Sequence, residues 1–100
     1  MNILKIVNGR VEIRRENGSL VRTIGDGGAV AAFFNANESL VLITTNKGKV
    51  EIRRENGSFV RNIGEGNAVS AIWSGSDIAI QTKNGRTEIR RENGSLVRTI

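Results

Sequence analysis

The chain repeats itself almost without change. The segment RVEIRRENGSLVRTIG at 10–25 returns at 49–64 with thirteen of sixteen positions identical, and its first fifteen positions return at 86–100 with one difference. Glu12, Glu51 and Glu88 mark the phase and lie 39 and then 37 residues apart. A repeat of this length indicates one supersecondary unit in several copies, each of which buries its apolar surface against its neighbours. The fold must therefore be modular.

Each period contains four apolar, β-branched runs separated by turn residues, and the chain has no Pro to interrupt them. Asn-Gly pairs between such runs favour tight hairpins, because both residues accept the positive φ angles of a type I′ turn. Each period is thus predicted to be a four-stranded antiparallel meander. The strands expected are Ala29–Phe34, Leu40–Thr44, Val50–Arg54 and Phe59–Ile63, followed by Ala68–Trp73, Ile78–Thr82, Thr87–Arg91 and Leu96–Ile100.

The two periods differ in length within 35–48, where a hairpin turn is expected to absorb the loss, because a deletion inside a paired strand would shift its register. The opening NILKIVNG aligns with the second strand of the later periods. We therefore expect an incomplete unit without its inner strand over 1–25, and complete units over 26–64 and 65–100.

Four strands in about 40 residues is the size of one β-propeller blade. In period and strand order the chain resembles the WD40 family of β-propellers. Gly25-Asp26-Gly27 and Gly64-Glu65-Gly66 occupy the place of the family's Gly-His, and Arg53-Arg54 lies near the place of its Trp-Asp, although those signature residues are absent. The resemblance implies an all-β propeller. Small residues in the proposed inner strands AVAAFF and AVSAIW agree with blades that converge on a crowded axis.

Three blades leave two apolar faces uncovered, whereas a propeller closes with about four or more. Identical chains joined head to tail would cover both faces, because the last blade of one chain offers the next chain the surface that internal blades offer each other. Two chains would form a six-bladed ring and three a nine-bladed ring, and we favour the dimer. Near-identity of the repeats fits recent duplication, design, or a piece of a longer propeller, and the sequence does not separate these origins.

Composition excludes several functions. With no Cys and no His, disulfides and a zinc site are excluded, and no cofactor or metal is expected. The lack of His, Cys and Tyr also leaves no usual nucleophile with its base, so we predict that the protein is not an enzyme. No signal-like or membrane-spanning apolar run occurs, so a cytoplasmic location is expected.

The repeated arginines are the main candidate for ligand binding. The net charge of +5 allows an acidic partner, and arginines repeated at every blade could follow a phosphate backbone. The alternative is local pairing with the glutamates of the same segments. A carbohydrate-binding propeller that uses Trp73 is a further alternative. We therefore expect a binding or assembly scaffold with an undetermined ligand. The candidate nucleic-acid residues are Arg14, Arg15, Arg53, Arg54, Arg90 and Arg91.

Overall fold

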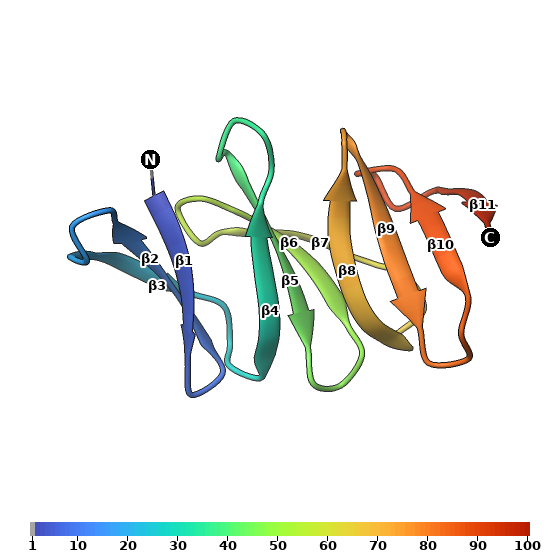
Figure 1. Ribbon diagram of the computed structural model, residues 1–100, viewed down its shortest axis with the longest axis horizontal. Coiled ribbons are helices and arrows are strands. Elements are labelled where there is room, and N and C mark those ends of the chain that lie inside the picture. Colours follow the sequence, from blue (N-terminus) through green and yellow to red (C-terminus); the bar gives the residue numbers. More distant parts are fainter. Residues whose placement is uncertain (1) are drawn as a thin grey trace.

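The computed structural model describes residues 2–100, which form eleven strands and no helix. The strands form three antiparallel sheets, each a meander in chain order (Figure 1). The first sheet contains β1 (Asn2–Val7), β2 (Arg10–Arg15) and β3 (Leu20–Ile24). The second contains β4 (Ala29–Phe34), β5 (Leu40–Thr45), β6 (Val50–Arg54) and β7 (Phe59–Ile63). The third contains β8 (Ala68–Ser74), β9 (Asp77–Thr82), β10 (Thr87–Arg90) and β11 (Leu96–Thr99).

The all-β prediction is confirmed, and no predicted strand end differs from the observed one by more than one residue. The two periods differ in length at the predicted hairpin. Residues 35–40 separate the paired Phe34 and Val41, whereas only residues 74–77 separate Trp73 and Ile78. The register of the flanking strands is preserved because the residues that the third sheet lacks fall in the turn. No helix in residues 2–100 is long and apolar enough to span a membrane.

The Asn-Gly hairpins do not all form the predicted type I′ turn. Among the described residues only Asn8-Gly9 has positive φ at both positions, 51° and 77°. At the β2–β3 hairpin, Gly18 N donates to Arg15 O at 2.8 Å and Gly18 alone has positive φ. The Asn17 carboxamide oxygen accepts from Ser19 N at 3.0 Å, and this bond holds the loop. This loop is therefore longer than a two-residue type I′ turn and ends in a bulge at the glycine.

Neighbouring sheets pack face to face. We call the side of a sheet that faces the next sheet along the chain its forward face, and the opposite side its backward face. The first cluster joins the forward face of the first sheet (Val11, Ile13, Ile24) to the backward face of the second (Ala29, Val41, Ile43). The second cluster joins the forward face of the second sheet (Leu42, Val50, Ile52, Ile63) to the backward face of the third (Ala68, Ala71, Ile78, Ile80).

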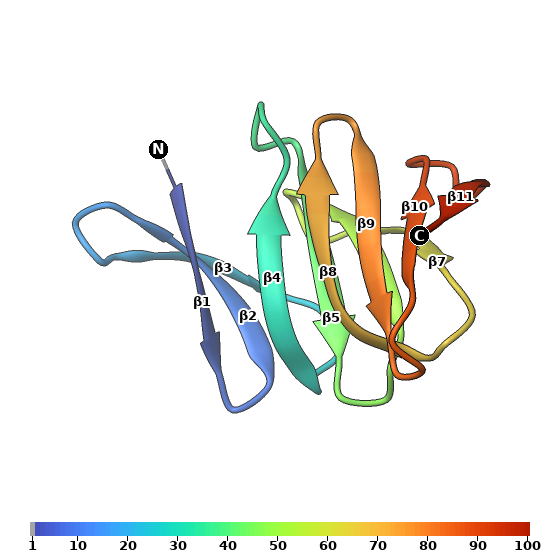
Figure 2. The ribbon, with the colours of Figure 1, turned by 45° about the vertical axis from the view of Figure 1, so that its right-hand side comes forward.

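The first strands of the three sheets, β1, β4 and β8, lie side by side along one side of the molecule (Figures 1 and 2). A register shift between Ala29 and Ala31, repeated between Ala68 and Ser70, interrupts the alternation of β4 and β8. The residues at these shifts, Val30 and Val69, are exposed. The inner strands therefore bury mainly their small residues, while these valines face away from the sheet contacts.

Two equivalent turns provide a test of how closely the sheets approach. Gly48 O accepts from Ala68 N at 2.9 Å, and a Cβ on Gly48 would lie 2.5 Å from Gly66 O. Gly85 has nearly the same φ, 85° against 83°, but nothing lies within 4 Å of its Cβ position. The β5–β6 turn therefore has no room for a side chain, whereas the β9–β10 turn is open.

We predict that Gly48→Ala lowers the free energy of unfolding by about 3 kcal/mol, because it combines left-handed strain with a backbone clash. Gly85→Ala is the matched control and should cost about 1 kcal/mol, from the φ angle alone. Urea denaturation followed by circular dichroism measures both. Equal losses would contradict the close contact between the second and third sheets.

Candidate functional site

A pair of arginines lies at the end of each of the equivalent strands β2, β6 and β10. The two side chains of a pair point to opposite faces, because strand residues alternate. The first arginine of each pair donates Nε to the glutamate two residues before it and Nη1 to the carbonyl of the hairpin glycine four residues after it. These bonds are Arg14 to Glu12 and Gly18 (2.8 and 2.6 Å), Arg53 to Glu51 and Gly57 (both 3.1 Å), and Arg90 to Glu88 and Gly94 (2.8 and 2.9 Å).

Arg53 is the most enclosed of these arginines, with a side chain that is 11% exposed. Its Nη2 lies 3.2 Å from Asp26 Oδ2, in the link between the first and second sheets. Its guanidinium carbon lies 5.4 Å from the centroid of the Phe59 ring. Arg53 thus connects its own hairpin to the preceding link by pairing with Asp26. Arg14, Arg53 and Arg90 serve internal contacts.

The second arginine of each pair has a different environment. Arg15, Arg54 and Arg91 are exposed. The structure therefore divides the six candidate nucleic-acid residues into an internal set and an exposed set, and nucleic-acid binding stays a prediction that would depend mainly on the exposed three. The pairing with glutamates of the same segment runs along one strand, from position i to i+2.

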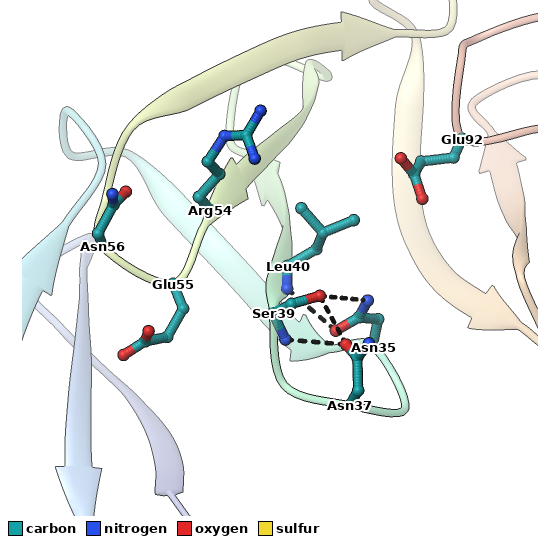
Figure 3. A pocket seen from close by; sticks show the side chains of 8 residues that line it. All are labelled: Asn35, Asn37, Ser39, Leu40, Arg54, Glu55, Asn56 and Glu92. Atoms are coloured by element: carbon teal, nitrogen blue, oxygen red, sulfur yellow. Dashed lines mark hydrogen bonds between the residues drawn. The ribbon is translucent and has the colours of Figure 1, made fainter.

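A polar hollow of about 490 Å³ lies between the second and third sheets. Figure 3 shows Arg54 and Glu92 on opposite sides of this hollow, with Leu40 between them and Glu55 turned away. The rest of the lining comes from Asn56 of the β6–β7 hairpin and from Asn35, Asn37 and Ser39 of the β4–β5 hairpin. The side chains of the β4–β5 hairpin bond mainly to one another: Asn37 Oδ1 accepts from Ser39 Oγ at 2.6 Å. The hollow can offer one guanidinium and carboxylates to a polar ligand.

A second hollow, of about 190 Å³, adjoins the first and shares Asn35, Asn37 and Glu92 with it. Trp73 lines this second hollow and also packs against the second core cluster. The indole Nε1 donates to Phe33 O at 3.1 Å, so this polar group is already satisfied. Trp73, the residue considered for carbohydrate binding, thus contributes to the core, and one part of its side chain still faces the hollow.

Chemistry beyond hydrogen bonding is sparse in the described part of the chain. No three carboxylates within residues 2–100 come close enough together to hold a metal ion.

One contact between sheets was not predicted from the sequence. Arg61 Nη1 donates to Asn93 O at 3.3 Å, from the second sheet to a hairpin of the third. An arginine recurs at this position of every repeat, and this recurrence was the sequence signal that could have predicted the contact.

No family model matches the chain, and no curated protein sequence matches it either.

We predict different consequences for the two arginines of one pair. Arg53→Ala leaves the Glu51 carboxylate, which is 15% exposed, without its partner, and removes the contact with Phe59. The free energy of unfolding should fall by about 2–3 kcal/mol. Arg54→Ala, the matched control, should change it by less than about 0.5 kcal/mol. Urea titration of both variants decides this, and equal effects would refute the division into internal and exposed arginines.

Proposed function

We propose that this chain is a segment of a WD40-like β-propeller that binds further copies of itself through its two uncovered sheet faces and serves as a non-enzymatic binding or assembly scaffold. Support comes from the meander of each sheet, the chain order of the strands, and the repetition of one sheet-to-sheet contact. Both internal contacts use equivalent positions of the repeat. A surface built twice in one chain is suited to be used again between chains.

One isoleucine–glycine contact carries the proposal. Ile24 is 3% exposed, and a Cβ on Gly57 of the next sheet would lie 3.1 Å from its Cγ2. Ile63 and Gly94 repeat this contact at 3.4 Å. The third isoleucine of the series, Ile100, is 75% exposed.

The glycine at the start of the series is also uncovered, because nothing lies within 4 Å of the Cβ position on Gly18. A second copy that continues the stacking of the sheets would place Ile100 of one copy against Gly18 of the next. The two unused halves of the repeated contact thus complement each other.

Polar substitutions on the two uncovered faces support the same pairing. On the backward face of the first sheet, Lys5 stands where the other two sheets have Ile43 and Ile80. Ile80 Cδ1 lies 3.2 Å from a Cβ built on Gly64, which follows Ile63. The paired row that contains Ile63 therefore lies opposite this position.

The corresponding row of the third sheet is Gln81, Thr87 and Ile100. Gln81 and Thr87 stand where the second sheet has Thr44 and Val50. Gln81 and Thr87 also line a hollow of about 230 Å³ on this face, and Arg86 lines the same hollow. A lysine ammonium from a second copy would bind the amide and hydroxyl oxygens there against the positive charge of Arg86. The one charged residue introduced on the backward face would thus meet the polar residues introduced on the forward face.

We favour a dimer because two copies would bring six sheets into the ring, within the usual range of four to eight blades. Three copies would bring nine, which lies outside that range. A closed dimer would contain two equivalent junctions. A substitution that destabilises the junction would therefore make the free energy of association less favourable at two places in the assembly.

Ile100→Asp should dissociate the assembly. It removes about 2 kcal/mol of apolar burial from each of two junctions and places a carboxylate in an apolar contact, so the dissociation constant should rise more than about a hundredfold. Ser95→Asp adds the same charge at an exposed position of the β10–β11 hairpin and is the matched control. Light scattering over a concentration series measures both. A wild-type chain that stays a monomer throughout the series would refute self-association.

Carbohydrate binding is a second candidate function, favoured by the two adjoining hollows and the partly exposed Trp73 that lines one of them. Sugars are held by planar and hydrogen-bonding groups of this kind. We predict that any glycan retained on an array by the wild-type protein is lost with Glu92→Ala, which alters both hollows, and is kept with Glu65→Ala, whose side chain is exposed elsewhere. An array without retained glycans would eliminate this candidate.

A further inference from the structure

The first strand of the first sheet has a free edge. β1 pairs with β2 on one side, and no strand in residues 2–100 pairs with its other side. In the second and third sheets the equivalent strands, β5 and β9, are paired on both sides, because β4 and β8 occupy the inner position. An uncovered edge presents backbone donors and acceptors that can bind another extended chain.

The repeat identifies which backbone groups of β1 are available. In the second sheet, Asn46 N donates to Gly28 O and Leu40 O accepts from Asn35 N, so alternate residues of β5 point to β4. Thr45 N donates instead to Lys49 O, toward β6. β1 pairs with β2 in the same register in which β5 pairs with β6. The N–H and C=O groups of Leu4 and Ile6 therefore point to the free edge.

Two further observations mark the same vacant position. Asn2 N, on this edge, donates to Glu38 Oε1 of the β4–β5 hairpin at 3.2 Å, so a side chain occupies one backbone donor where strand pairing is absent. At the opposite end of the chain, the turn at Gly85 is open, whereas the equivalent Gly9 and Gly48 carbonyls accept from Ala29 N and Ala68 N, at the start of β4 and β8.

We propose that the β1 edge is a binding site for an extended peptide with the inner-strand pattern of this repeat: glycine-rich at its start, then small residues, then two bulky apolar ones. β4 and β8 both have this pattern and both occupy this position in their sheets. The peptide would pair antiparallel with β1 and complete a fourth strand of the first sheet.

The occupant would also contact a second copy. The start of β8 bonds to Gly48 of the preceding sheet, so the start of the added strand would bond to Gly85 of a preceding copy. This second contact rests on the proposed self-association, whereas pairing with β1 does not. The site would therefore function in a single copy and bind more tightly in an assembly.

The probe is a fluorescein-labelled synthetic peptide with the sequence of residues 64–74, GEGNAVSAIWS, titrated into the 100-residue chain and followed by anisotropy. Ile72 lies in register with Ala79, the equivalent of Leu4, and Ala71 lies in register with Ile80. N-methylation at Ile72 removes a donor that faces β1 and should weaken binding about tenfold or more. N-methylation at Ala71 removes a donor on the far side and should change affinity less than about twofold.

Hydrogen exchange locates the bound peptide. We expect the Leu4 and Ile6 amides to gain protection when the unmodified peptide is bound, both in the wild-type chain and in Ile100→Asp. Protection in both proteins without any dimer would support the edge site while the self-association proposal failed. Dimer formation without peptide binding, equal effects of the two N-methyl groups, or unchanged exchange at Leu4 and Ile6 would overturn the edge site.

Discussion

The middle sheet of this chain has two apolar faces, and the arrangement of the molecule follows from the need to cover them. A strand that alternates polar and apolar residues has one face to hide, but here opposite sides of the middle sheet contribute to two separate core clusters. The middle sheet is covered by both neighbours, whereas each outer sheet is covered on one side. Large exposed apolar residues, such as Ile3 on the first sheet and Ile100 beside the third, occur at the uncovered positions. The stability of the fold therefore depends on stacking rather than on any single sheet.

Stacking also determines where polar residues can occur. Arg53 stays among apolar neighbours because Glu51, Gly57 and Asp26 satisfy its donors. The bonds to the glutamate and to the hairpin glycine recur in all three sheets and fix each of these β-hairpins against the strand that precedes it. Exposed polar side chains gather at the hairpins around the two adjoining hollows. Internal ion pairs and exposed arginines are thus built from adjacent residues of one short repeated segment.

Much of this arrangement could be predicted from the sequence, because the repeat defines the strand order and the hairpin that loses two residues. The ion pairing of Arg14, Arg53 and Arg90 was an alternative that the repeated glutamates suggested. What alternation could not predict is the pair of bulges in the inner strands, which expose Val30 and Val69. A bulge adds one residue to one strand only, so the alternation of side chains between the two faces shifts by one residue beyond it. The hollow at Glu92 was also beyond prediction, because it needs the spacing between two sheets.

The central claim is that Ile100 of one copy meets Gly18 of another, and a disulfide measures it directly. A Cβ on Gly57 would lie 3.7 Å from Ile24 Cβ, within the range for a disulfide, and the chain has no native Cys. The β2–β3 hairpin, which contains Gly18, and the C-terminus lie at opposite ends of the molecule, so one chain cannot bridge itself (Figure 1). In Gly18→Cys/Ile100→Cys under mild oxidation, the account predicts a closed covalent dimer that reduction converts back to single chains. Two free thiols per chain at concentrations where the wild type is assembled would contradict it.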